Sequence, residues 1–401
     1  MIGLQSLNLS FIDIIMTDAV GWIWNSPTWP KFRYDPDLLI EPLSRARDMA
    51  GRLRGKAEAI GADDLALVEG EVWAGNAVAT SAIEGETLNM AAVRSSVAIR
   101  LGTTPTILAP VPRNVEGLLD VMNDAAANWR SELGEERLIG WQAALFPESR
   151  SGLLKVETGS FRTHGDPMQI VSGPVGKEVV HYLAPPAAAV RAEMRNYLDW
   201  FNGTKESAAI DGILRAGLAH LWFESIHPFA DGNGRVGRAI IDMALSQDIR
   251  LASRLHGMSM ELRRRQTDYY AALNHAQRGD GDATEWLVWF TDSFRESCRT
   301  SIALIDEALV RAKFWNQHKN VELNARQRKA LNRMLAPGPG KFEGGMTSRK
   351  YMALTKAKYI TANRDLVDLV AKQLLVREGG GRSTFYNLTI PGWGWVPARA
   401  N

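Results

Sequence analysis

The most informative segment of the chain is HPFADGNGRVGR, His227 to Arg238. It contains GNGRVG, which fits the G-x-G-x-x-G pattern of a dinucleotide-binding loop. Such a loop needs a strand immediately before the glycines and an acidic residue about 20 positions after them. Here the preceding run ILRAGLAHLWFESIH has helical spacing, and RLASRL stands where the acidic residue belongs. The sequence therefore argues against a dinucleotide-binding loop.

The glycines of this segment instead predict an anion-binding turn. Gly232, Asn233 and Gly234 are small or turn-forming residues, so successive backbone N–H groups can converge on one anion. A helix that begins near Arg235 would add the positive end of its dipole. We therefore expect phosphate to bind at this turn.

Four side chains beside the glycines extend the expected phosphate site. Asp231 offers the hard carboxylate oxygen that suits Mg²⁺ when it bridges phosphates. Arg235 and Arg238 are three positions apart, so they share a helix face and can bind further phosphate oxygens. His227 is a base that titrates near neutral pH. This combination predicts phosphoryl or nucleotidyl transfer, in which positioning and charge neutralisation dominate.

At every specified position, HPFADGNGRVGR resembles the signature of the Fic family, HPFx(D/E)GNGRxxR. The resemblance implies an all-helical core that transfers AMP from ATP to a hydroxyl group of a target protein. Matched by position, His227 would deprotonate that hydroxyl, and Asp231 would hold Mg²⁺ on the α- and β-phosphates. The turn would surround the phosphates, and Asn233 would also orient the α-phosphate.

Two further segments resemble parts of the same family. GSFRTHGDPMQIVSGPVGKEVVHYLAPP is similar to its flap, a hairpin that docks the target segment by backbone pairing. The docking edge of this flap is expected to include Ile170 and Val171. YYAALNHAQRGD is similar to the region that closes over the adenine, and its expected nucleotide contacts are Tyr270 and Gln277.

An inhibitory segment is expected upstream of the motif. Apolar residues recur at helical spacing in LALVEGEVWAGNAVATSAIEGETLN, and Gly85 is the expected stop of that helix. The end of this helix, TSAIEG, resembles the family's inhibitory motif (S/T)xxxE(G/N), which assigns to it Thr80, Glu84 and Gly85. The resemblance implies that Glu84 pairs with Arg238, which then cannot also bind the γ-phosphate. WIWNSPTWPKFRYD is also similar to a module found ahead of such Fic domains.

The composition is that of an ordinary globular protein and argues against several other classes of protein. The 401 residues carry a net charge of +2 and no uncharged apolar run of the ~18 residues that a membrane helix needs. Neither a membrane role nor nucleic-acid binding by the whole molecule is therefore expected. The single cysteine, Cys298, excludes an intramolecular disulfide and fits a cytoplasmic protein. Residues 1–15 make a poor signal peptide, and we interpret them as a dispensable extension before a natural start at Met16.

The pattern after this extension predicts three parts. Residues 16–105 form an N-terminal module with the inhibitory helix, and residues 106–312 form the Fic catalytic core. Residues 322–392 read as a basic helix, two short helices and two β-like runs, which is the order of a winged helix-turn-helix. The expected fold is therefore mainly α, a Fic-type helical core with a β-hairpin flap plus a C-terminal winged helix-turn-helix. Asn363 and Arg364 on its recognition helix are placed to contact DNA, although winged helices also bind proteins.

The function expected from the sequence is transfer of AMP from ATP, with Mg²⁺, to a Tyr, Thr or Ser hydroxyl of a protein substrate. Two alternatives stay open: a DNA-binding transcriptional regulator whose Fic core senses nucleotide, and a hydrolase that mainly removes AMP. The presence of His227 favours an enzyme, because binding ATP requires no base. A homodimer is also left open, as are the target protein and the modified residue.

Overall fold

The structure is a computed structural model that describes residues 21–103, 110–151, 154–172, 179–207, 209–250, 254–336 and 338–396. The predicted extension at residues 1–15 and part of the predicted flap, residues 173–178, lie outside the described residues. The chain divides into two compact units between Ile302 and Ala303, within the long helix α12 (Thr284–Gln317). The finer division predicted near residue 105 lies inside the first unit and stays a prediction.

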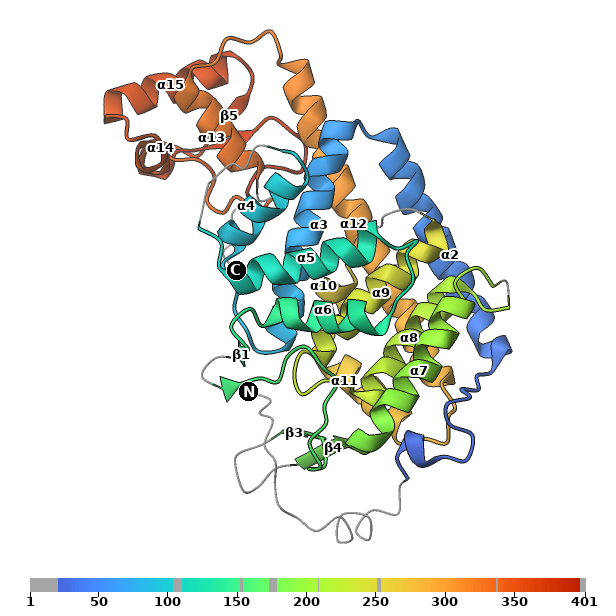
Figure 1. Ribbon diagram of the computed structural model, residues 1–401. Coiled ribbons are helices and arrows are strands. Elements are labelled where there is room, and N and C mark those ends of the chain that lie inside the picture. Colours follow the sequence, from blue (N-terminus) through green and yellow to red (C-terminus); the bar gives the residue numbers. More distant parts are fainter. Residues whose placement is uncertain are drawn as a thin grey trace. The chain divides into compact units, whose positions relative to one another are not determined.

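The first unit is built mainly from helices, which confirms the predicted fold class (Figure 1). Besides the first part of α12, its helices are α2 Pro36–Ala59, α3 Ala62–Ile83, α4 Met90–Arg100, α5 Arg113–Ala127, α6 Glu135–Leu145, α7 Ala187–Gly203, α8 Gly212–Ile226, α9 Asn233–Ile249, α10 Met258–Arg264 and α11 Gln266–Gln277. Helix α4 is not expected from the sequence; the side chain of Asn89 caps it by accepting hydrogen bonds from the N–H groups of Ala91 and Ala92. Within the described residues, no helix combines the length and the apolar character needed to cross a membrane.

Short antiparallel pairs of strands connect α6 to α7. Strand β1 (Arg150–Ser151) pairs with β2 (Leu154–Lys155), and β3 (Gln169–Ser172) pairs with β4 (Val179–Leu183). The second pair is the predicted hairpin. Its register shifts between Ile170, which faces Tyr182, and Val171, which faces Val180.

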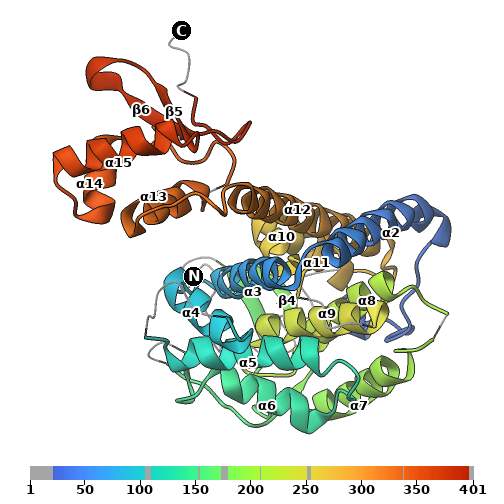
Figure 2. The same ribbon diagram turned by 90° about the horizontal axis from the view of Figure 1, so that it is seen from above.

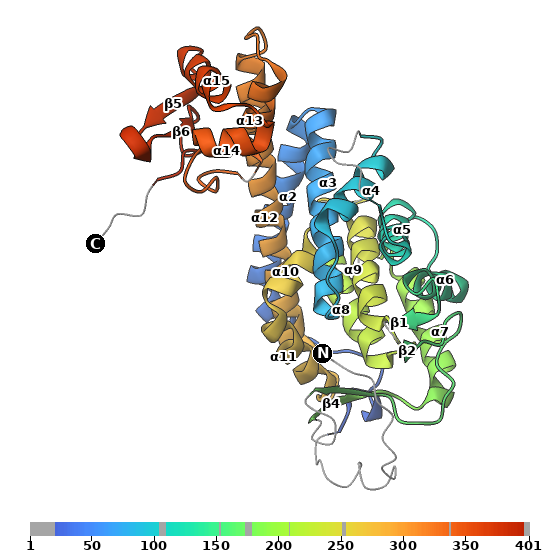
Figure 3. The same cartoon turned by 90° about the vertical axis from the view of Figure 1, so that its left-hand side faces the viewer.

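Helices α8 and α9 form the centre of the first unit, and the segment HPFADGNGRVGR joins them. Every residue of α8 from Ile213 to Ile226 is buried, which explains why its sequence is apolar on all faces. Helix α9 contacts α5 and α6 on one side and α3 and α10 on the other (Figure 2 and Figure 3). The motif is therefore held between packed layers of helices.

The N-terminal aromatic segment, which includes a short 3-10 helix η1 (Ile23–Asn25), covers the hairpin and α8. The ring of Trp22 packs edge-on against Tyr182 of β4, with ring centroids 5.4 Å apart. The indole of Trp24 donates a hydrogen bond of 2.7 Å to the carbonyl of Leu183. Trp29 packs against Trp222 of α8 with ring centroids 6.1 Å apart. These contacts tie the flap and the central helix to the start of the chain.

The second unit contains the elements in the order predicted for residues 322–392. They are α13 Ala325–Leu335, α14 Ser348–Thr355, α15 Tyr359–Ala371, β5 Leu375–Glu378, a 3-10 turn η2 Gly381–Ser383, and β6 Phe385–Leu388. Strands β5 and β6 are antiparallel. Asp365 joins the helices, because it accepts hydrogen bonds from Arg326 and from the hydroxyl of Tyr351. Asn363 and Arg364 are exposed on α15.

Two glycines of the α5–α6 pair give a matched test of this packing. Gly117 of α5 lies so close to α6 that an added Cβ would collide with the carbonyl oxygen of Ala144. We expect Gly117→Ala to lower the free energy of unfolding by about 1–3 kcal/mol through overpacking. An added Cβ at Gly140 of α6 meets nothing within 4 Å, so Gly140→Ala should raise the free energy of unfolding by about 0.5–1 kcal/mol. Urea unfolding followed by circular dichroism measures both, and a Gly117→Ala variant as stable as the parent would contradict the close approach.

Candidate active site

The loop between α8 and α9 is shaped by two left-handed residues. His227 ends α8 with φ 50°, and its N–H donates to the carbonyl of Phe223 at 2.9 Å. Gly232 precedes α9 with φ 89°, where a side chain would be strained and a Cβ would approach the ring of Phe146 to 2.9 Å. The first N–H groups of α9 have no acceptor within the helix, so this end attracts anions. This backbone fits an anion-binding turn, and binding of phosphate there stays a prediction.

Asn233 fixes the shape of this loop. Its Oδ1 accepts a hydrogen bond of 2.9 Å from the N–H of Phe229, and its Nδ2 donates one of 2.8 Å to the carbonyl of the same residue. The side chain is buried, as is that of Phe229, which packs on Phe161. The oxygen and one N–H group of the carboxamide are thus engaged in shaping the loop. The contact of Asn233 with the α-phosphate stays a prediction.

Arg162, which the sequence reading did not single out, holds the loop from the other side. Its buried guanidinium donates to the carbonyl of His227 at 2.8 Å through Nε. Its Nη2 donates to the carbonyls of Pro185 at 2.5 Å and Ile226 at 3.3 Å. The arginine thus binds the last carbonyl groups of α8, which have no partner within the helix. A single arginine in an aperiodic run carries no sequence signal for this role.

The imidazole of His227 is kept neutral by its surroundings. Burial and then the positive charge of Arg162 lower the pKa of His227 to about 3. Near neutral pH the ring therefore carries no charge, and its lowered pKa makes it a weaker base than an exposed imidazole. Its Nδ1 lies 3.8 Å from Oε2 of Glu224, one helical turn earlier on α8.

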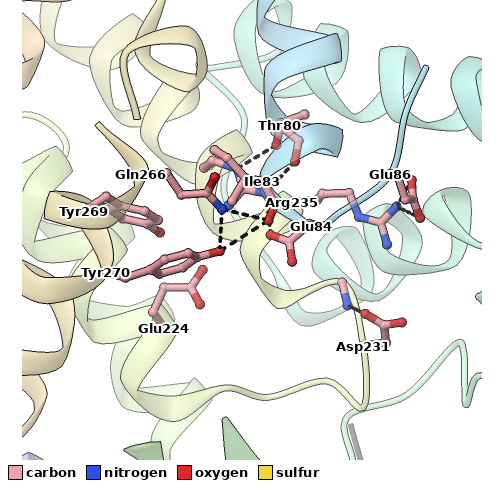
Figure 4. A network of polar contacts seen from close by, with 12 residues as sticks. Thr80, Ile83, Glu84, Glu86, Glu224, Asp231, Arg235, Gln266, Tyr269 and Tyr270 are labelled. Carbon is pink, nitrogen blue, oxygen red and sulfur yellow. Dashed lines mark hydrogen bonds and ion pairs between the residues drawn. The ribbon is translucent and has the colours of Figure 1, made fainter. Parts of the chain in front are cut away.

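Glu224 is a buried carboxyl group that faces the site. Burial raises the pKa of Glu224 to about 8; the attraction of Arg238 opposes the rise and the negative charge of Glu84 adds to it. The side chain lies below Tyr270 and is directed toward Glu84 (Figure 4). A Cβ at Gly237 of α9 would collide with Oε1 of Glu224, so the glycine provides the space that this carboxyl group occupies. Near neutral pH Glu224 is therefore mostly protonated.

Arg238 is bound by the end of α3, and the predicted pair with Glu84 is present. Its Nη2 donates to Oε1 of Glu84 at 2.7 Å, its Nε donates to Oγ1 of Thr80 at 2.6 Å, and Nη2 also reaches the carbonyl of Thr80 at 3.1 Å. Burial disfavours the charge of Arg238, but the combined effect of Glu84, Tyr269 and Glu224 outweighs burial and raises the pKa of the guanidinium. Oε1 of Glu84 also lies where a Cβ of Gly234 would be, against the backbone of the anion-binding turn.

The end of α3 is a Schellman turn that depends on Gly85. This residue has φ 81°, its N–H donates to the carbonyl of Ala82 at 3.2 Å, and the N–H of Glu86 donates to the carbonyl of Ser81 at 2.9 Å. Helix α11 holds the same turn from the side. Both the hydroxyl of Tyr270 at 3.3 Å and Nε2 of Gln266 at 3.2 Å donate to the carbonyl of Ile83 (Figure 4). Tyr270, predicted to contact the adenine, therefore contacts the inhibitory segment in this structure.

The remaining predicted residues lie in different places. The side chain of Gln277 is completely buried between α11 and α8, where Nε2 donates to Oγ of Ser225 at 3.5 Å. The structure thus places Gln277 in the core, and its contact with the nucleotide stays a prediction. In the flap, Val171 is buried and Ile170 packs against a small cluster that includes Tyr182. The docking role of these two residues stays a prediction.

Asp231 lies on the loop, apart from the Glu84 contacts (Figure 4). Its Oδ1 accepts a hydrogen bond of 2.6 Å from the N–H of Gly232. In the described part of the chain, no three His, Cys, Asp or Glu side chains lie together as metal ligands. Mg²⁺ in nucleotide sites typically uses one or two carboxylates and takes its other oxygen ligands from phosphates and water. The single carboxylate of Asp231 beside a phosphate-binding turn fits this pattern.

Comparison with known proteins agrees with this geometry. Residues 132–245 match the model of the Fic/DOC family, and residues 22–103 match that of a domain of unknown function, DUF4172. The fold is similar to the crystal structure of a Fic family protein from Desulfovibrio desulfuricans G20, with a TM-score of 0.53 and 22% identity, over 90% of this chain and 98% of that chain. The chain therefore carries a Fic/DOC-family domain, which confirms the family expected from HPFADGNGRVGR.

Two curated relatives are similar to a part of the chain. A probable protein adenylyltransferase of Aquifex aeolicus (strain VF5) is 33% identical over 98 residues, which are 24% of this chain and 27% of that protein. The protein adenylyltransferase fic-1 of Caenorhabditis elegans is 33% identical over 91 residues, which are 23% of this chain and 16% of that protein. The chain therefore matches only 16% to 27% of the length of these relatives.

The raised pKa of Glu224 predicts a specific pH dependence of stability. A carboxyl group whose pKa is higher in the folded state stabilises the fold below its ordinary pKa of 4.5, and this contribution is lost as the pH rises through about 8. We expect Glu224→Gln to gain stability relative to the parent over that range, by roughly 1.4 kcal/mol for each unit of pKa shift. Denaturant unfolding across the pH range measures the difference, with Glu58→Gln on the exposed face of α2 as the control. Parallel profiles of Glu224→Gln and the parent would show that the pKa is not raised.

Proposed function

We propose that this protein is an adenylyltransferase that transfers AMP from ATP to a hydroxyl side chain of a target protein. The observation that carries the proposal is the α8–α9 loop, which combines a neutral base, His227, with an anion-binding helix start and a buried arginine, Arg238. The Fic/DOC match and the names of the curated relatives support it.

The chemistry follows from the charges around this loop. The triphosphate binds at the start of α9, where backbone N–H groups and the helix dipole stabilise its negative charge. His227 accepts the proton of the target hydroxyl while the hydroxyl oxygen attacks the α-phosphorus. A P–O bond to the target forms, the bond between the α- and β-phosphates breaks, and pyrophosphate leaves. The negative charge of the nucleotide raises the affinity of the buried imidazole for this proton. Asp231 would hold the Mg²⁺ that accompanies ATP, whose charge would help to neutralise the phosphates.

Glu84 inhibits this reaction through Arg238. The guanidinium that would bind the γ-phosphate donates instead to Glu84 and to Thr80. The carboxylate also brings negative charge against Gly234, where the phosphates would bind. ATP would therefore bind weakly or in an unproductive position until Glu84 moves.

Target docking belongs to the flap in this proposal. Two-stranded sheets have unpaired backbone groups on their outer edges, and an extended target segment can pair with them. Ile170 and Val171 of β3 are the residues that we assign to this contact. DNA binding by the second unit and formation of a homodimer stay predictions from the sequence.

Labelled ATP tests the proposed reaction directly. We expect label from the α-phosphate, and not from the γ-phosphate, to enter a protein substrate or the chain itself in the presence of Mg²⁺. Glu84→Gly should raise incorporation by roughly one to two orders of magnitude, because a hydrogen bond to a charged group contributes about 1.5–3 kcal/mol. His227→Ala in the Glu84→Gly background should lower it by about 10²–10⁴-fold through loss of the general base.

The other outcomes distinguish the alternatives. Transfer of the γ-label would identify a kinase. Release of AMP from a modified protein without incorporation would favour the hydrolase. Binding of ATP without any transfer, even in Glu84→Gly, would contradict the proposal and favour a nucleotide-sensing regulator.

A further inference from the structure

The second arginine of the motif is also held by the end of α3. Nη1 of Arg235 lies 3.2 Å from each carboxylate oxygen of Glu86. The guanidinium is stacked over the ring of Phe146, 4.8 Å from its centroid, and the arginine side chain is buried. Figure 4 shows Glu86 facing Arg235 on the side of the loop opposite Tyr270.

One turn presents both inhibitory contacts. In the Schellman turn, Glu84 is the C-cap residue of α3, Gly85 is the left-handed residue after it, and Glu86 follows Gly85. The two hydrogen bonds of the turn fix the directions of the chain on either side of Gly85. The carboxylates are therefore positioned as a pair, and a change in the turn displaces both of them.

We infer that Glu86 is a second inhibitory residue that acts through Arg235. Together with the contact between Glu84 and Arg238, it forms a two-point latch that must open at both points for nucleotide to bind with full affinity. This inference rests on the proposed function, because it takes the phosphates of ATP as the ligand of the two arginines.

The contacts of Arg235 indicate a guanidinium that is only partly satisfied. Its buried Nε has no hydrogen-bond partner in the described part of the chain, and both contacts to Glu86 are longer than the 2.7 Å contact between Arg238 and Glu84. A phosphate group offers several oxygens and can accept from both edges of a guanidinium. A nucleotide phosphate is therefore a better partner for Arg235 than the single carboxylate that holds it.

The negative charges of Glu84 and Glu86 oppose the binding of a nucleotide at the start of α9. Two carboxylates lie beside the start of α9, where the helix dipole and the N–H groups favour anions. They supply the negative charge that the triphosphate would bring. Removal of Glu84 alone leaves one carboxylate and one arginine engaged, so the site stays partly closed.

Nucleotide affinity measures the latch without relying on transfer activity. The probe is α,β-methylene-ATP with Mg²⁺, titrated calorimetrically into the full chain. We expect Glu86→Gln to lower the Kd by about five- to tenfold, both in the parent and in the Glu84→Gly background. Glu71→Gln, which removes the 2.7 Å pair with Arg94 at another position of α3, is the matched control and should leave the Kd unchanged.

The outcomes separate this inference from the proposed function. If Glu84→Gly tightens binding and Glu86→Gln changes the Kd no more than Glu71→Gln does, the two-point latch is wrong while the proposed function stands. If no variant binds the nucleotide, including the double variant, the proposed function fails and the latch fails with it.

A backbone change tests whether the turn links the two contacts. A Cβ added at Gly85 or at Gly102 meets nothing within 4 Å, and both residues have positive φ, 81° and 69°. Gly102 ends α4 in a similar turn, in which its N–H donates to the carbonyl of Ile99 at 3.1 Å. Gly85→Ala therefore strains only the turn that presents the carboxylates, and we expect it to lower the Kd in the direction of the double variant. Gly102→Ala should not change the Kd; equal values for the two alanine variants would overturn the linkage.

Discussion

A buried charge is costly unless it is paired and hydrogen-bonded, and the site is organised around which partner Arg238 has. In the structure the partner is Glu84, and Thr80 accepts a hydrogen bond from the same side chain. The pair lies against the start of α9, so the carboxylate occupies the region of positive potential that a phosphate would use. In the proposed function, inhibition and substrate binding therefore use one set of hydrogen-bond donors.

The groups that would bind the phosphates and the carboxylates that compete with the phosphates lie on different elements of the fold. The base, the turn and both arginines belong to α8, α9 and the loop between them, which are packed on nearly every face. The inhibitory carboxylates belong to the end of α3, which is secured by a glycine turn and by side chains of α11. Because the carboxylates lie on a different element from the catalytic loop, the end of α3 can move while the loop keeps its geometry.

The sequence predicted the parts of this site that are local. A contiguous motif determined the family, and apolar spacing with a glycine stop located α3 and its end. Arg162 and Glu86 were missed because their partners are supplied by distant segments, and no periodicity reports such contacts. Glu224 lies one helical turn from His227, but the burial that raises its pKa depends on packing that the local sequence does not show. Asn233 and Gln277 were placed in the site by resemblance, and the motif does not show that Asn233 binds the backbone of Phe229 or that Gln277 is buried against Ser225. Contacts across the core decide which polar groups of a motif are left available to a ligand.

The most direct test of this account is an experimental structure of the Glu84→Gly variant with a non-hydrolysable ATP analogue and Mg²⁺. The account predicts that the α-phosphate lies at the first N–H groups of α9, within reach of a hydroxyl oriented by His227. It also predicts that Arg238 donates to the γ-phosphate instead of to the end of α3. A nucleotide bound elsewhere, or one bound here while Arg238 still contacts only Thr80, would contradict it.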